Sequence, residues 1–254
     1  MSNPLRKALR RVKFAVRAQL GRLSKNETYD RQTAWVIRRV LRRDSCSIDV
    51  GCHRGDILKH MLKAAPEGYF YAFEPLPDFC AGLRQKFADP GIEIHQIALS
   101  DEAGEAEFNH VISNPAYSGF RRRRYDRPAE TDTRIKVRMD RLDDIVDTHR
   151  KIDLMKIDVE GAELQVLRGA TAMLKRDQPI VVFEHGLGAA DFYGTRPEHV
   201  HDVLVGQCGM EIWTMDDWLR GAAPMSLAAF REQFDKCLNY YFLAGPPGGP
   251  SSRH

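Results

Sequence analysis

Residues 47–55 read Ser47-Ile48-Asp49-Val50-Gly51-Cys52-His53-Arg54-Gly55, and this stretch decides the class of fold. It begins as a short apolar run, which is typical of a buried strand, and it ends in a D-x-G-x-x-x-G turn. Residues 57–65 follow with apolar side chains at helical spacing. The stretch therefore predicts a strand, a tight glycine turn and a helix, which together open a βαβ unit.

Strands and helices alternate along the rest of the chain, and this alternation favours an α/β fold with a parallel sheet. The expected strands are 47–50, 69–73, 92–99, 152–157, 180–183, 211–215 and 239–243. The expected helices are 57–65, 77–87, 140–148 with Asp140 as N-cap, 162–175, 197–207 and 227–236. Two added strands, 105–111 and 134–139, interrupt the alternation and flank an Arg- and Tyr-rich exposed loop, 114–128.

The charge of the chain is unevenly distributed. The 254 residues carry a formal net charge of +3, yet residues 1–25 contain eight Lys and Arg and no acid, which leaves about −5 on the rest. We therefore expect a basic helical extension (1–43), an acidic body (44–244) and a disordered Gly- and Pro-rich tail (245–254). The acidic body argues against a nucleic-acid partner. Residues 1–25 could pack on the domain, contact a membrane surface or form a dimer.

Cysteine usage and hydropathy bear on localisation. The five cysteines form no C-x-x-C pair, which favours reduced thiols in the cytoplasm. No apolar run approaches the roughly 20 residues that span a bilayer. The basic N-terminus has no continuous apolar stretch, so we do not expect a secretory signal peptide. We expect a cytoplasmic protein that could bind peripherally to the inner membrane face.

Polar residues follow five of the expected strands. Because ligands bind beyond the carboxyl ends of strands in an open α/β sheet, these residues should mark the functional site. They are Asp49, Gly51 and Gly55 after the first, Glu74 after the second, Ser100 and Asp101 after the third, Asp158 and Glu160 after the fourth, and Glu184 and His185 after the fifth.

The glycine turn indicates the kind of ligand. It lacks the third glycine of a dinucleotide loop, and Asp49 adds negative charge where a pyrophosphate would approach. These two features argue against a nicotinamide-dependent oxidoreductase. They favour a ligand with an ammonium group and a carboxylate, such as the methionyl part of S-adenosyl-L-methionine. Glu74 lies 25 residues after Asp49, where a carboxylate can accept both ribose hydroxyls.

The chain resembles the FkbM-type S-adenosylmethionine-dependent methyltransferases over about residues 45–245. The motifs that carry the resemblance are Ile48 to Gly55, Phe73-Glu74-Pro75, Ala98 to Asp101, Lys156 to Glu163, Val166 to Ala170 and Phe183-Glu184. The resemblance implies the doubly wound, Rossmann-like sheet of class I methyltransferases, with seven strands of which the last is antiparallel. It also implies O-methylation of a sugar, polysaccharide or natural product, which would make a sugar or glycoconjugate the acceptor.

The resemblance also assigns cofactor residues. Its first cofactor motif matches Asp49, Gly51, Cys52, His53 and Gly55. Glu74, followed by Pro75, matches the acid that binds the ribose. Ser100 or Asp101 would flank the adenine, and Asp158 would lie near the methionyl end or the reacting methyl.

A sugar hydroxyl is a poor nucleophile, so a general base should assist its attack on the methyl. His185, Glu160 and Glu184 are the candidates, of which His185 has the most suitable ordinary pKa. Glu160 could instead cap the following helix. Clustered carboxylates could hold a divalent metal, although no ligand spacing in the sequence indicates one. A methyltransferase of RNA or of a small natural product, or a non-catalytic nucleoside-binding scaffold, are the alternatives.

Overall fold

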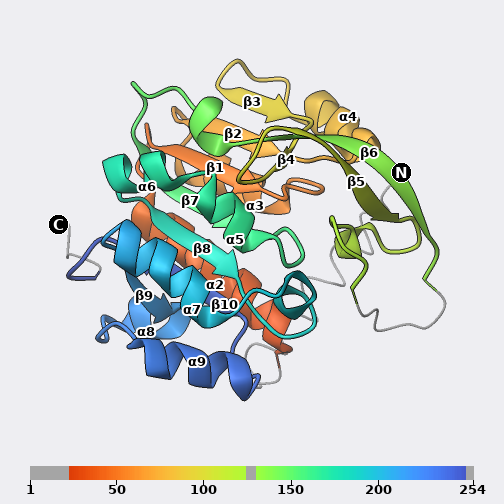
Figure 1. Ribbon diagram of the computed structural model, residues 1–254. Helices are drawn as coiled ribbons and strands as arrows, with labels where there is room; N and C mark the ends of the chain where they lie inside the picture. Colours follow the sequence, from red (N-terminus) through yellow and green to blue (C-terminus); the bar gives the residue numbers. More distant parts are fainter. Residues whose placement is uncertain (1–22, 124–129, 250–254) are drawn as a thin grey trace.

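The computed structural model describes residues 23–123 and 130–249, and a seven-stranded sheet forms its centre (Figure 1). The strand order is β3-β2-β1-β7-β8-β10-β9, and β10 runs antiparallel to both of its neighbours. The expected doubly wound, mostly parallel α/β sheet is confirmed. Its strands are β1 (Cys46–Val50), β2 (Tyr69–Phe73), β3 (Ile92–His95), β7 (Ile152–Ile157), β8 (Ile180–Glu184), β9 (Glu211–Thr214) and β10 (Tyr241–Gly245).

The order of strands reverses between β1 and β7, which are parallel neighbours. The chain first moves outward from β1 to β3 and then returns to the centre at β7. Val50 pairs with Phe73 of β2 on one side and with Ile157 of β7 on the other. The segments that follow these three strands therefore leave one sheet edge at the same level, which is where a crevice forms in this topology.

Helices cover both faces of the sheet, each against its own apolar cluster. One face packs against α2 (Lys25–Val40), α3 (Asp56–Ala64), α4 (Pro77–Lys86) and α8 (Met215–Arg220). The other packs against α5 (Glu163–Arg168), α6 (Thr171–Asp177), α7 (Pro197–His201), the π-helical η4 (Asp202–Gln207) and α9 (Leu227–Asp235). None of the helices in the described part of the chain is long and apolar enough to cross a bilayer.

The helix α2 belongs to the core of the domain. A capping box between Ser24 and Glu27 starts it, and Val36 and Ile37 are completely buried against the sheet. The first part of the basic helical extension expected over 1–43 falls on residues 1–22, which lie outside the described residues. The domain boundary at residue 44 stays a prediction, but the packing of α2 shows that the core begins before it.

Three expected elements differ from the structure. The strand expected at 92–99 ends at His95, because its partner β2 ends at Phe73, opposite His95. Residues 98–99 instead form β4 (Ala98–Leu99), which pairs with β6 (Asp132–Asp140) of a second sheet. Asp140 is therefore the last residue of a strand and not an N-cap. Only a 3-10 turn, η2 (Leu142–Asp144), follows it.

The helix expected at 162–175 is divided into α5 and α6. Gly169 lies at the break, and a Cβ there would come within 2.0 Å of the Ser100 carbonyl oxygen. The backbone at Gly169 therefore packs directly against the backbone at Ser100, and a side chain at residue 169 would prevent this contact.

A second, three-stranded sheet lies beside the β2–β3 side of the main sheet (Figure 1). Its long hairpin joins β5 (Gly104–Val111) to β6 and confirms the two added strands. Phe108 and Val137 pack there with Leu76 and Ala98, which follow β2 and β3. The small sheet thus forms a wall next to the carboxyl ends of the central strands.

Candidate active site

A cavity of about 400 Å³ lies at the carboxyl ends of β1, β2 and β7, where the strand order reverses. The small sheet and the segment after β5 complete its wall through Phe108, Ser118 and Phe120. The expected site residues on the lining are Gly51, Cys52, His53, Glu74, Pro75, Asp158 and Glu160.

The two glycines of the turn serve close packing of the chain. Gly51 has a φ of +72°, and a Cβ on it would lie 1.9 Å from the carbonyl oxygen of Asp158. Gly55, with a φ of +71°, precedes α3 and presses against Phe87. The lack of a side chain at Gly51 is therefore needed so that the segment after β7 can pack against the turn. Gly55 does not line the cavity.

Glu74 lies at the floor of the cavity and is 4% exposed. The backbone N–H of His53 donates to its Oε2 at 2.8 Å, and that of Leu76 donates to its Oε1 at 3.0 Å. Burial raises its pKa to about 7, although both hydrogen bonds favour the ionised form. These two backbone donors therefore fix the orientation of the Glu74 carboxyl group.

The buried Lys156 was not anticipated as a site residue. Its Nζ lies 3.2 Å from Oδ2 of Asp158 and 3.9 Å from Oδ1 of Asp49, which is fully buried beneath the glycine turn. Burial alone would lower the pKa of Lys156, but the two carboxylates raise it above its ordinary value. The spacing of two between Lys156 and Asp158 was the available signal, because it puts both side chains on one face of β7.

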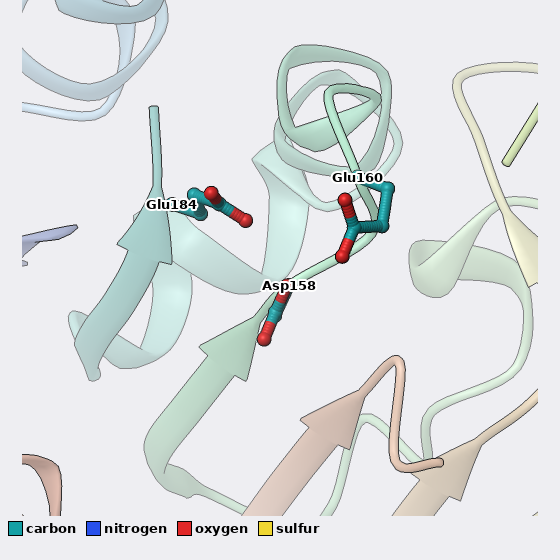
Figure 2. Close-up of side chains that lie close together, drawn as sticks. All are labelled: Asp158, Glu160 and Glu184. Atoms are coloured by element: carbon teal, nitrogen blue, oxygen red, sulfur yellow. The ribbon is translucent and has the colours of Figure 1, made fainter. Parts of the chain in front are cut away.

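Asp158, Glu160 and Glu184 bring a carboxylate oxygen each within 4.8 Å of one another, and their side chains converge from the ends of β7 and β8 (Figure 2). The Tyr241 hydroxyl donates to Asp158 Oδ2 at 2.6 Å. Burial would raise the pKa of Asp158, but Lys156 and its hydrogen-bond donors hold it below the ordinary value. Burial and the Asp158 charge raise the pKa of Glu184 well above its ordinary value. The surroundings thus favour the ionised form of Asp158 and the protonated form of Glu184.

Glu160 forms an ion pair with Arg123 at the edge of the cavity. Both side chains are 16% exposed, and the guanidinium of Arg123 lies 4.9 Å from the ring centre of Tyr117. Part of the Arg-rich segment expected to be exposed therefore turns inward. The φ of Glu160 is +58°, which is uncommon for a residue with a side chain and is held by the surrounding loop.

Glu163 explains how that loop is held, and the sequence reasoning missed it. It is almost fully buried, and its Oε1 accepts from the backbone N–H groups of Val159 and Gly161, each at 3.1 Å. The last acid of the stretch Asp158-Val159-Glu160-Gly161-Ala162-Glu163 thus stabilises the conformation of the loop. Burial raises the pKa of Glu163 to about 7.

Besides Asp49, Gly55 and Glu184, which do not line the cavity, Ser100, Asp101 and His185 are absent from its lining. The Ser100 hydroxyl donates to Asp101, and Asp101 lies 3.8 Å from Arg168. The lining there consists of Ile97, Ala98 and Leu99, because the chain has already turned into the second sheet.

His185 also lies away from the cavity. It is 1% exposed and stacks on Phe234 with ring centres 4.8 Å apart. Neither ring nitrogen has a hydrogen-bond partner among the described residues, and burial lowers its pKa to about 3. His185 therefore lies as a neutral ring in the apolar core under α9, and not with the carboxylates. Strand periodicity explains this, since consecutive residues Glu184 and His185 point to opposite sides.

The sheet order, the antiparallel β10 and the cavity at the reversal of strand order define a class I methyltransferase. The chain belongs to the FkbM methyltransferase family, since residues 49–212 match the model of the Methyltransferase FkbM domain. It therefore contains a methyltransferase domain of this family.

Individual relatives agree with this family. The 2-O-methyltransferase NoeI of Sinorhizobium fredii is 27% identical over 152 residues, which cover 52% of this chain and 60% of NoeI. Methyltransferase sdnD of Sordaria araneosa is 27% identical over 152 residues, covering 48% of this chain and 59% of sdnD. The chain thus spans about three fifths of the length of these curated relatives. The crystal structure of Methyltransferase FkbM from Methylobacillus flagellatus KT has a TM-score of 0.50 at 12% identity, covering 80% of this chain and 44% of that chain, and shows a similar fold.

Proposed function

We propose that this enzyme is an S-adenosyl-L-methionine-dependent O-methyltransferase that acts on a hydroxyl of a sugar or glycoconjugate. The observation that carries the proposal is the single cavity that joins the Glu74 carboxylate at one end to Asp158 and Glu160 at the other. The name of NoeI, a 2-O-methyltransferase, supports transfer to oxygen.

The residues on the lining fit this cofactor. Glu74 has acceptor capacity left for ribose hydroxyls, and Ala98, Leu99 and Phe108 offer an apolar surface to the adenine. The Nε2 atom of His53 is buried and has no partner among the described residues, which suits contact with a polar ligand. The ionised Asp158 favours positive charge at the methionyl end. When bound, this cofactor supplies a methyl group on a sulfonium.

The protein then has to place the acceptor oxygen and remove its proton. Glu160 lines the cavity as a carboxylate, and Arg123 orients it through their ion pair. We assign Glu160 as the general base that takes the proton of the acceptor hydroxyl. Glu184 hydrogen-bonds Asp158, and its raised pKa favours the protonated form, so we assign it the role of a neutral donor that keeps the Asp158 carboxylate in place.

The test is transfer of labelled methyl groups from S-adenosylmethionine into separated glycan, lipid-linked sugar and RNA fractions. Label in a sugar-containing fraction, in an alkali-stable ether, is the expected result. Label in the RNA fraction would instead show that the enzyme is an RNA methyltransferase, and the proposed sugar acceptor would be wrong. Absence of binding of S-adenosylhomocysteine in calorimetric titration would favour a scaffold that does not use this cofactor.

Replacing Glu74 with alanine should weaken S-adenosylhomocysteine binding about 10- to 100-fold, which corresponds to the roughly 1.5–3 kcal/mol of a charge-assisted hydrogen bond. Isothermal titration calorimetry measures the loss. Glu102→Ala, an exposed acid outside the cavity, is the matched control and should bind as the unmodified protein does. Equal affinity in a folded Glu74→Ala variant would remove Glu74 from the ribose site.

Cofactor affinity should also depend on pH through Glu74, whose pKa is about 7. Ribose hydroxyls donate to the ionised carboxylate, so affinity should fall about tenfold per unit once the pH drops below this pKa. The stability of the ligand-free protein changes in the opposite sense, because a raised carboxyl pKa destabilises the fold as the pH rises from about 4.5 to 7. Titrations from pH 5.5 to 8.5 check this, and Glu74→Gln should flatten the affinity profile near pH 7.

A further inference from the structure

Asp30, on helix α2, lies on the wall of the cofactor cavity. The residue precedes the segment 49–212 that matches the family, and it falls within the extension that the sequence places outside the catalytic body. It meets the cavity next to Asp56, Ile57 and His60 of α3. The family match therefore does not account for a carboxylate at this position of the cavity wall.

The Asp30 carboxylate has no hydrogen bond or ion pair within the part of the chain that the structure describes. The cations and acids near it are engaged elsewhere. Arg31, the next residue, stacks its guanidinium 4.3 Å from the ring centre of Trp35. Asp56 pairs with Lys59 at 2.7 Å. Asp30 is therefore an acid on the cavity wall that these neighbouring charged groups leave without a direct partner.

The position of Asp30 identifies the part of the ligand that it faces. Burial raises the pKa of Asp30, the nearby Asp158 charge raises it further, and the Lys156 charge lowers it, so both of these residues act on Asp30. Asp30 thus lies toward the Asp158 end of the cavity, which the proposed function gives to the amino-acid part of the cofactor. That part carries an ammonium group, which requires acceptors.

Two other acids at this end of the cavity, Asp49 and Asp158, are either inaccessible or already paired within the protein. Asp49 is fully buried behind the turn, and Asp158 is occupied by Lys156 and Tyr241. We propose that Asp30 binds the ammonium group of the amino-acid part of the cofactor, so that α2 completes the methionyl end of the site. This assignment rests on the proposed function. It makes α2 a part of the binding site as well as of the core.

Calorimetric titration with two ligands tests the proposal. S-adenosylhomocysteine carries the amino-acid part, whereas 5′-methylthioadenosine is the same nucleoside thioether without it. Asp30→Asn should weaken S-adenosylhomocysteine about 10- to 100-fold and leave 5′-methylthioadenosine unchanged. Asp44→Asn, an exposed aspartate outside the cavity, is the matched control and should change neither affinity.

The two proposals fail in different ways. Unchanged S-adenosylhomocysteine affinity in Asp30→Asn, or an equal loss for both ligands, would overturn the role of Asp30 while the proposed function stands. If the unmodified protein binds neither ligand, both proposals are overturned. Because Asp30 is exposed toward the cavity, Asp30→Asn should melt at the same temperature as the unmodified protein, which excludes unfolding as the cause of any loss.

Discussion

Replacing Lys156 with methionine should lower the free energy of unfolding by about 3–5 kcal/mol, the usual cost of breaking a buried ion pair from one side. Methionine preserves the length and the apolar stem of the lysine but removes its charge. Asp49, which is fully buried, and Asp158 then lose the cation that lies between them. Urea unfolding followed by circular dichroism measures the change.

Two further variants show whether charge is the cause. Lys151→Met removes an exposed lysine just before β7 and should cost less than about 0.5 kcal/mol. Adding Asp49→Asn to Lys156→Met should recover part of the stability, because the orphaned acid is then neutral. A Lys156→Met variant within 1 kcal/mol of the unmodified protein would show that the lysine does not compensate these acids.

Glu160→Gln should reduce kcat about 10²- to 10⁴-fold, the range that a general base contributes. Glutamine has nearly the same shape and still accepts a hydrogen bond from Arg123, but it cannot take the proton of the acceptor hydroxyl. The affinity for S-adenosylhomocysteine should change by less than about threefold, because the amide keeps the cavity intact. Steady-state kinetics at saturating acceptor, together with calorimetry, separate the two effects.

Glu184→Gln is the matched control for this prediction. We assign Glu184, whose pKa is raised, as a neutral donor to Asp158, and an amide reproduces that role. We expect kcat within about threefold of the unmodified enzyme. If instead Glu184→Gln were as damaging as Glu160→Gln, the proton would pass through Glu184, and the assignment of the base to Glu160 would be wrong.

The sequence predicts the main sheet well because its signals are local. Buried strands read as short apolar runs, and their alternation with helices leaves few topologies. The split of residues 92–99 between two sheets could not be predicted, because both halves are apolar and only the partner available at each position separates them. The amphipathic pattern of residues 162–175 likewise does not show that Gly169 must pass against Ser100.

In the candidate site, too, the sequence predicts the positions of some residues and not of others. Glu74, Asp158 and Glu160 follow strands, so topology alone brings them to one sheet edge. His185 also follows a strand, yet the alternation of side chains turns it into the apolar core, where burial lowers its pKa. Asp30 comes from a helix far from the motifs, and no local pattern connects it to them. The acceptor, the boundary at residue 44 and the role of residues 1–25 stay predictions.

By itself the sequence determines the fold class and the family of this protein. The stretch from Ile48 to Gly55 can only be a strand and a tight turn, and its neighbours repeat the unit. Only the tertiary structure decides which acids are charged. Asp158 and Glu184 are both carboxyl groups at strand ends, but Lys156 lowers the pKa of the first, whereas burial and the Asp158 charge raise the pKa of the second. Protonation depends on burial and on neighbouring charges, and both arise only when distant segments meet.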